Sequence, residues 1–304
     1  LISIFLKMLM ITILTPTFNR AYLLPRLFES LVHQTSFNFE WLVIDDGSTD
    51  ETQDLFVEEA FMSTSFPIRY YKQENGGKHR ALNAGVRQAK GDFIFIADSD
   101  DCLLPEAVAI VEQHAVAIAN DGAFAGVAGL DIFDDGRVVG TGLPQDTIDC
   151  NAMDIRYRYH VDGDLKEVFK TAVLQEYPFP EIQGEKFCPE QLVWFRIAQK
   201  YKLRYFNTPI YVAEYQANGI TASIIRVRML APQVTCMMYA EMLAYRIPFK
   251  EKVKAAINFW RFKACAPSQV MITPLKGGWQ LCYPIGMLFH WRDKKQLGTS
   301  SSLK

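Results

Sequence analysis

The sequence lacks the features that mark several large classes of protein. Its six cysteines include no C-x-x-C pair and no histidine at ligand spacing, so we expect neither a disulfide framework nor structural zinc, and a reducing cytoplasm fits better. The five histidines do not cluster, so any metal should be held by oxygen ligands. Uninterrupted apolar runs long enough for a membrane span are also lacking.

The sequence has no surplus of charge of either sign. It carries 32 Lys and Arg against 34 Asp and Glu, a net charge of −2. Phosphate-backbone binding needs an excess of cations, so nucleic acid is not expected as the main partner. Apolar residues make up 49% of the 304 positions, which allows a substantial core in one large domain, or in one domain with a smaller appendage.

Short apolar runs alternate with amphipathic stretches in the first part of the chain. This alternation predicts the α/β class, with a doubly wound, mainly parallel sheet covered by helices. The first run, LISIFLKMLMITIL, has Lys7 in its middle and no cleavage site after it, so we expect a buried strand from Met8 to Thr15 rather than a signal peptide. The five predicted strand regions are residues 9–15, 40–46, 67–73, 91–98 and 124–133.

An acidic cluster, Asp98-Ser99-Asp100-Asp101, follows the apolar run FIFIA directly. Carboxylates spaced i and i+2 can share one Mg²⁺ or Mn²⁺ and leave coordination sites for phosphate oxygens. The alternative is an Asp-rich turn in which Asp101 caps a helix beginning near Pro105. In a doubly wound sheet such a cluster lies at the carboxyl ends of the strands, where ligands bind.

Two further polar segments are expected at the same edge. Asp45-Asp46 could accept hydrogen bonds from a nucleobase or a ribose, or could belong to a turn. The segment 75–80, NGGKHR, combines flexible backbone with cations, which suits a diphosphate or, alternatively, a solvated loop. Neither G-x-G-x-x-G nor GxxxxGK[ST] is present, which argues against a Rossmann dinucleotide site and a P-loop.

The combination resembles the family 2 glycosyltransferases with the GT-A fold. The motifs that carry the resemblance are TPTFNR (15–20), VIDDGSTD (43–50), NAG (83–85), AKGD (89–92) and DSDD (98–101). The resemblance implies an inverting transfer from a nucleotide-diphosphate sugar, with Mn²⁺ or Mg²⁺ bound at Asp98 and Asp100. It also implies these nucleotide-binding residues: Thr15, Pro16, Thr17, Asp45, Asp46, Lys78, Arg80 and Asp98.

Inversion at an anomeric carbon needs a general base for the acceptor hydroxyl. In the family this base is an acidic residue at a helix start, often in a Glu-Asp pair. The matching stretch here has Glu190 followed by Gln191, and we assign the base to Glu190. The alternative is that Glu190, just after Pro189, only favours the helix N-terminus. Asp164 and Glu185 are the reserve carboxylates on the acceptor side.

The resemblance implies a GT-A catalytic domain over residues 1–221, with a nucleotide-sugar half (9–130) and an acceptor half (131–221), followed by a helical region over 222–304. In that region, residues 276–295 contain aromatic side chains flanked by cations. Such a segment can contact a bilayer, placing a cytoplasmic protein at the inner face of the membrane, or can cover a core.

The leading hypothesis is a metal-dependent glycosyltransferase of bacterial surface-polysaccharide synthesis. Its donor would be a nucleotide sugar, with UDP as the expected carrier, and its acceptor a saccharide or a lipid-linked sugar. A sugar nucleotidyltransferase is a second hypothesis, although TPTFNR replaces the Gly-rich loop that those enzymes carry after the first strand. A non-catalytic nucleotide-sugar-binding module is the third.

Overall fold

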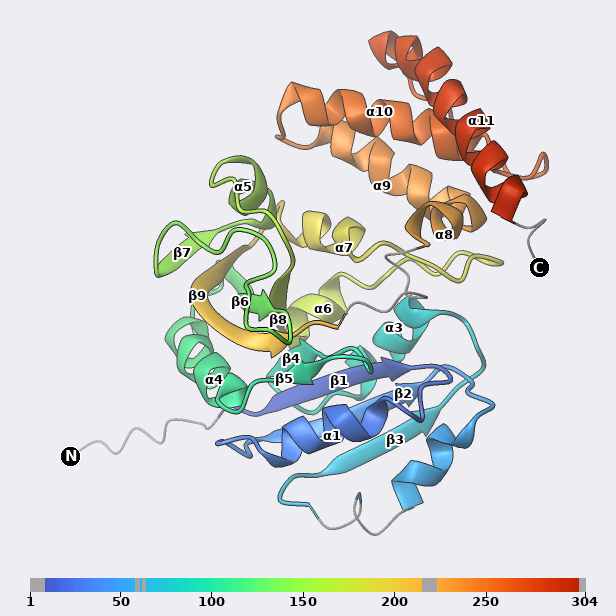
Figure 1. The fold of residues 1–304 in the computed structure, drawn as a ribbon. Coiled ribbons are helices and arrows are strands. Elements are labelled where there is room, and N and C mark those ends of the chain that lie inside the picture. The colour runs from blue at the N-terminus through green and yellow to red at the C-terminus, as the bar shows by residue number, and fades with distance from the viewer. Residues whose placement is uncertain (1–8, 58–60, 62–63, 215–222, 301–304) are drawn as a thin grey trace. The chain divides into compact units, whose positions relative to one another are not determined.

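The chain divides into two compact units (Figure 1). The structure is a computed structural model that describes residues 9–57, 61, 64–214 and 223–300. The first unit consists of residues 1–178 and 195–215, and the second of residues 179–194 and 216–304. The predicted domain boundary between residues 221 and 222 lies outside the described residues.

One sheet of nine strands organises the first unit. Its order is β3-β2-β1-β4-β8-β6-β9-β5, and β7 pairs with β9. The pairs among β1, β2, β3 and β4 are all parallel. The strands are β1 (Ile11–Thr17), β2 (Phe39–Asp45), β3 (Ile68–Lys72), β4 (Phe93–Ile96), β5 (Cys102–Leu103), β6 (Phe124–Ile132), β7 (Thr147–Cys150), β8 (Leu165–Lys170) and β9 (Lys202–Val212).

The predicted α/β class is confirmed, but the parallel order ends at β4. β8 lies between β4 and β6 and is antiparallel to both. The apolar run over 124–133 therefore forms β6 without continuing the parallel series. The position of β8 between β4 and β6 could not be predicted from local sequence patterns, because β8 comes from a later part of the chain than both. The first strand also lies slightly later than expected, at Ile11–Thr17.

Helices cover both faces of the parallel strands. On one face, α1 (Leu24–Val32) buries four apolar side chains at helical spacing, and α4 (Ala107–Ile118) contributes to the same core. On the other face, α3 (Lys78–Gln88) packs so closely on β1 that a Cβ at Gly85 would lie 2.2 Å from Leu14 Cδ1. The first unit also contains the 3₁₀ helix η1 (Glu51–Val57), α5 (Ala152–Tyr157) and α6 (Thr171–Glu176).

The second unit is helical in its C-terminal part. α10 packs against both α9 and α11. Within the part of the chain that is described, no helix is long and apolar enough to cross a membrane. The helices are α8 (Ile224–Leu230), α9 (Pro232–Ala244), α10 (Phe249–Lys263), the 3₁₀ helix η2 (Gly277–Cys282) and α11 (Tyr283–Ser300), while α7 (Glu190–Ile197) begins in this unit and ends in the first.

Candidate active site

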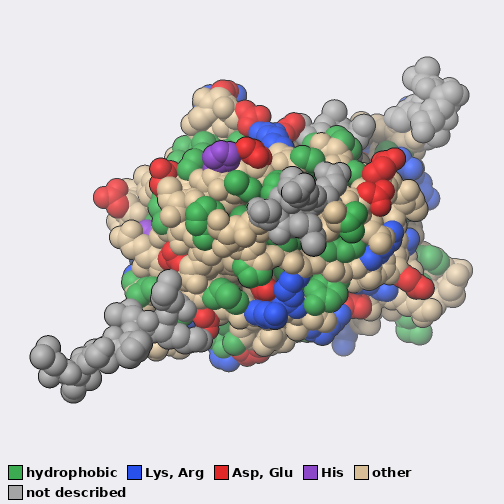
Figure 2. All heavy atoms as spheres, turned by 90° about the horizontal axis from the view of Figure 1, so that it is seen from below, with side chains coloured by type: hydrophobic (Ala, Val, Ile, Leu, Met, Phe, Trp, Pro, Cys, Tyr) green, Lys and Arg blue, Asp and Glu red, His purple; other side chains and the backbone are tan. Residues whose placement is uncertain are grey.

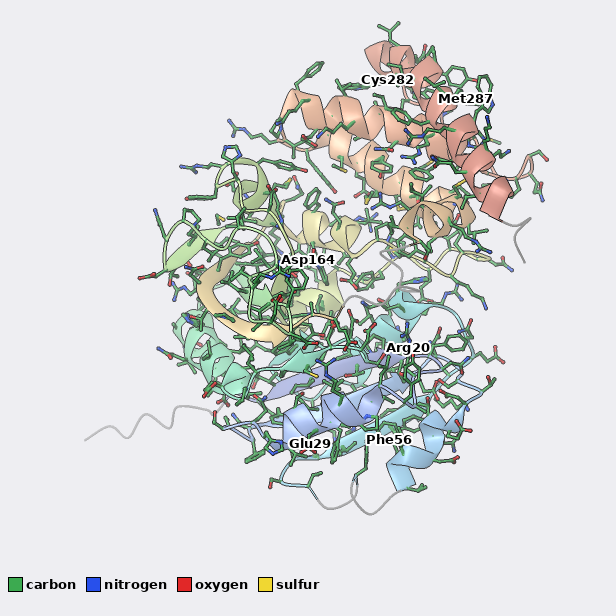
Figure 3. All side chains as sticks on the ribbon, in the orientation of Figure 1. Arg20, Glu29, Phe56, Asp164, Cys282 and Met287 are labelled. Atoms are coloured by element: carbon green, nitrogen blue, oxygen red, sulfur yellow. The ribbon has the colours of Figure 1, made fainter. Side chains whose placement is uncertain are left out.

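The carboxyl ends of β1, β2 and β4 lie side by side, because these strands are parallel and adjacent in the sheet. At this edge Thr17 pairs in register with Asp45. The acidic cluster after β4 therefore lies beside the loops that follow β1 and β2, as the sequence predicted. Arg20, labelled in Figure 3, belongs to the loop after β1, and its guanidinium lies 3.9 Å from a carboxylate oxygen of Asp100.

Asp98 is held ionised in the midst of this cluster. Its Oδ1 lies 2.6 Å from Nζ of Lys78, the first residue of α3. Its backbone N–H donates to the hydroxyl of Tyr211 at 2.7 Å. Burial opposes ionisation, but the positive charges of Lys78 and Lys166 outweigh it and hold the pKa of Asp98 below its usual value.

The neighbouring carboxyl groups have the opposite tendency. Burial and the negative charge of Asp98 raise the pKa of Asp100. Burial also raises the pKa of Asp101 to about 7, against the opposing charge of Lys166. Asp101 accepts a hydrogen bond from the N–H of Glu214 at 2.8 Å, rather than capping α4, whose start carries no side-chain cap. The cluster thus concentrates acidic groups whose mutual repulsion a cation would relieve.

Asp46 organises the loop between β3 and α3. Its carboxylate accepts hydrogen bonds from Gln73 Nε2 at 2.8 Å, Gly76 N at 2.9 Å and Gly77 N at 2.6 Å. Asn75 Nδ2 adds a longer bond at 3.1 Å. Gly77 has φ +98°, which favours glycine, and the helix that carries Lys78 begins at the next residue. Asp46 therefore positions the Lys78 helix.

Replacing Asp46 by alanine should lower the free energy of unfolding by about 3 kcal/mol, because buried N–H groups of the loop lose a charged acceptor. Urea unfolding of the full chain would measure this. The matched control is Asp54→Ala, at an exposed carboxylate of the same unit, which should change stability little. Equal effects of the two substitutions would contradict the structural role of Asp46.

Three predicted nucleotide contacts have internal partners. Asp45 is fully buried, accepting from the N–H of Ser48 at 2.7 Å and from the hydroxyl of Tyr70 at 2.5 Å. The hydroxyl of Thr15 is buried and accepts from the indole N–H of Trp41 at 3.0 Å. Together with Asp46, these side chains stabilise the loops of the edge. The contact of these side chains with a nucleotide stays a prediction.

The remaining predicted residues of this edge stay compatible with a ligand. Pro16 and Thr17 are buried at the end of β1, and Thr17 Oγ1 has no hydrogen-bond partner within the described residues. Arg80 lies in the first turn of α3, against Gly76, where a Cβ would be only 2.5 Å from Arg80 Cδ. A larger residue at position 76 would displace the Arg80 side chain.

Sequence reasoning missed a buried group of charged and phenolic side chains next to Asp98. Nζ of Lys166, on β8, lies 3.5 Å from the centroid of the buried Tyr211 ring. The charges of Asp131, Asp98 and Asp101 raise the pKa of Lys166 although its burial opposes this. No local pattern marks these residues, because β6, β8 and β9 bring them together from distant parts of the chain.

Asp131 should make stability fall as pH rises. It is 4% exposed, and burial raises its pKa to about 7, with Lys166 opposing and Asp164 adding to the shift. Between pH about 4 and about 7 the unfolded chain is ionised at this residue while the folded chain keeps its proton, which costs at most about 4 kcal/mol by pH 7. Asp131→Asn lacks this titration. Its stability relative to the unsubstituted chain should therefore increase over this range.

Urea unfolding at several pH values would check this, with Asp135→Asn as the control, because that carboxylate is exposed. A stability difference between the Asp131 variant and the unsubstituted chain that does not vary with pH would contradict the assignment.

The acceptor-side residues occupy different settings. Glu190 is half-buried at the first position of α7, in the second unit. Glu185 is buried, and its carboxylate accepts from the N–H groups of Gln233 at 2.7 Å and Val234 at 2.9 Å. It thus caps the start of α9, and its reserve assignment as the base stays a prediction. Asp164 is exposed in the loop before β8, in the first unit (Figure 3).

Comparison with known proteins bears on the motif-bearing part of the chain. The family model for glycosyl transferase family 2 matches residues 12–138. This segment contains β1, β2 and β4 and the three loops described above. An uncharacterized glycosyltransferase of Haemophilus influenzae is 37% identical over 110 residues, which is 34% of this chain and 35% of that protein. The match thus spans about a third of the length of that relative.

Two further similarities extend beyond this segment. The GalNAc(5)-diNAcBac-PP-undecaprenol beta-1,3-glucosyltransferase of Campylobacter jejuni is 29% identical over 194 residues, covering 62% of this chain and 59% of that protein. The crystal structure of TarS residues 1–349 from S. aureus, in complex with UDP, shares the fold with a TM-score of 0.59 at 18% identity. That likeness covers 95% of this chain and 92% of the other.

The family match covers the same loops that meet at the carboxyl edge of the sheet, and the structural likeness covers nearly the whole fold. Residues 12–138 match glycosyl transferase family 2, and the chain has the fold of the GT-A glycosyltransferases.

Proposed function

We propose that this chain transfers a sugar from a nucleoside diphosphate sugar, with UDP as the expected carrier, to a saccharide or a lipid-linked acceptor. The observation that carries the proposal is the ion pair between Lys78 and Asp98, with 2.6 Å between Nζ and Oδ1. It lies beside Asp100 at the carboxyl edge of the sheet. Cationic side chains and a bound metal ion can each neutralise the charge of a diphosphate, and this edge offers lysine, arginine and paired carboxylates.

The residues at this edge fit a divalent cation. Asp98 and Asp100 supply oxygen ligands, and Mg²⁺ or Mn²⁺ commonly binds one or two carboxylates together with substrate phosphates. Among the described residues no group of three or more His, Cys, Asp or Glu side chains could hold a metal on its own. The phosphates would therefore have to complete the coordination. When bound, the ion would neutralise charge on the departing diphosphate.

The chain's own residues would perform the other steps. Lys78 and Arg20 carry positive charge to the diphosphate, and the loop ordered by Asp46 keeps Lys78 at the helix start. The acceptor hydroxyl must lose a proton as its oxygen attacks the anomeric carbon. We assign the role of general base, which removes that proton, to Glu190. The assignment rests on the family resemblance of the segment around Pro189.

The acceptor class is proposed from the C. jejuni relative, whose name specifies an undecaprenol-linked substrate. A role in surface-polysaccharide synthesis would follow from such an acceptor. A nucleotidyltransferase is a weaker alternative, because the family model covers the donor loops of a glycosyltransferase.

A donor screen tests the proposal. The full chain is incubated with UDP-, GDP- and other nucleotide sugars and Mn²⁺ or Mg²⁺, with saccharide and lipid-linked acceptors, and release of the nucleoside diphosphate is measured. Titration calorimetry of UDP and GDP with and without Mn²⁺ accompanies it. Absence of binding to every nucleotide under both conditions would contradict the proposal. Binding without release in any reaction would favour the non-catalytic module.

A further inference from the structure

An apolar stripe runs along the outer side of the last helix. We define the α11 stripe as Leu281, near the end of η2, together with Pro284, Ile285, Leu288 and Trp291 of α11. The four α11 residues recur at intervals of three and four residues and so share one helix face. Leu281 is 82% exposed, Leu288 64% and Trp291 63%. Single exposed apolar residues are ordinary on protein surfaces, but a continuous row of large ones marks an interaction surface.

The opposite face of α11 is firmly attached to α10. At Gly286 the helices approach so closely that a Cβ would lie 2.6 Å from Trp260 Cβ. One turn further, His290 Nδ1 lies 3.1 Å from the carbonyl oxygen of Arg261. Nε of Arg261 donates to the buried carboxylate of Asp293 at 2.5 Å. These contacts fix the rotation of α11 about its axis. The packing of α11 on α10 therefore leaves the stripe exposed.

The C-terminal region is strongly basic. Residues 223–304 contain 13 Lys and Arg but only three Asp and Glu, a net charge of +10 in a chain whose total is −2. Two of these cations, Arg292 and Lys295, are exposed and continue the α11 stripe by one further turn. By contrast, acidic, basic and apolar side chains are interspersed on the face of the molecule that Figure 2 shows.

We propose that the α11 stripe and the cations beside it bind the surface of an anionic lipid bilayer. Apolar side chains in a row would enter the boundary between headgroups and acyl chains, and the positive charge would be attracted to acidic headgroups. The combination identifies the partner: a nucleic acid would use the cations but leave large apolar side chains in water, whereas a second copy of the region would bring two +10 segments together.

This inference does not depend on the proposed transfer reaction. It bears on the proposed lipid-linked acceptor in one respect. Binding to a bilayer would hold the chain at the surface where such an acceptor resides.

Vesicle co-sedimentation of the full chain tests the proposal. The vesicles contain phosphatidylcholine alone, or phosphatidylcholine with about one third phosphatidylglycerol, which supplies the negative surface. We expect binding to the anionic vesicles that is at least about tenfold stronger than to the neutral ones, and that weakens when NaCl is raised from about 0.1 M to about 0.5 M. Failure to bind anionic vesicles would overturn the proposal.

Variants separate the stripe from charge alone. Leu288→Glu with Trp291→Glu should lower binding to anionic vesicles at least about tenfold, since both side chains would have to enter the interface. The matched control is Val116→Glu, at an exposed residue of α4 in the first unit, which should bind as the unsubstituted chain does. Arg292→Glu with Lys295→Glu, at the two cations that continue the stripe, provides a second test that leaves every apolar residue in place, and it should also weaken binding.

The remaining outcomes are decisive as well. Circular dichroism melting verifies that each variant is folded. If the stripe variant binds vesicles as well as the unsubstituted chain, the stripe is not the contact. In another outcome, the unsubstituted chain fails to bind vesicles and sediments as a dimer, while the Leu288→Glu, Trp291→Glu variant sediments as a monomer. That result would show that a second copy of the chain covers the stripe. Retention of random duplex DNA without vesicle binding would assign the charge to nucleic acid. UDP binding, measured on the same samples, is expected to be unchanged throughout, so a failure of the proposed function would be recognised separately.

Discussion

Replacing Asp100 by asparagine should lower the rate of sugar transfer by about 10²- to 10³-fold, the cost of removing one group that stabilises charge in a transition state. The same substitution should remove the enhancement of UDP binding by Mn²⁺. The reason is that the substitution removes one of the two carboxylates proposed to bind the ion. The remaining one, Asp98, is already paired with Lys78. Calorimetry with and without Mn²⁺, together with steady-state rates on the donor found in the screen, would measure both effects.

The control for this prediction is Asp135→Asn. That carboxylate is exposed and pairs with Arg137 in the same unit, so its loss changes the net charge equally. It should leave transfer and Mn²⁺ dependence within about twofold. An Asp100 variant that retains Mn²⁺-enhanced binding would show that the metal is held elsewhere.

Replacing Glu190 by glutamine should reduce transfer by about 10²- to 10⁴-fold, the usual contribution of a general base. Binding of UDP should remain within about threefold, because the proposed base acts on the acceptor and not on the donor.

The matched control is Glu181→Gln, an exposed residue of the same unit. It should preserve transfer. Glu185→Gln is expected to behave differently from both, by destabilising the α9 start that its carboxylate caps. Near-normal transfer by the Glu190 variant would show that this residue only favours the start of α7, which was the alternative interpretation of the sequence.

The donor half of the fold could be predicted because its information is local. Each parallel strand is a short apolar run, and the polar residues that follow it must meet at one edge, whatever the details of packing. The clustering of Asp98 and Asp100 with Lys78 therefore needed only the alternation of runs and the polar segments that follow them. The helical spacing of Leu24 and Leu27, both buried in α1, is local information of the same kind.

The acceptor half was less accessible to this reasoning. The strand β8 enters the sheet between β4 and β6 only in the folded chain, and it brings Lys166 beside Asp98. The partners of individual carboxylates were not predictable in either half: Asp46 in the donor half and Glu185 in the acceptor half both accept hydrogen bonds from backbone N–H groups. Which acid binds a ligand and which orders a loop depends on partners 30 or 48 residues away, and no spacing rule encodes them.

The carboxylate of Asp46 has an evolutionary consequence. It joins the turn after β2 to the chain around Gly76, so neither segment can change length alone without stranding the other's hydrogen-bonding groups. Across homologous sequences, substitutions at position 46 should coincide with insertions or deletions between positions 73 and 77. Homologues without an acid at this position should have a different loop between β3 and α3. Their preference among nucleotide carriers would then be worth measuring.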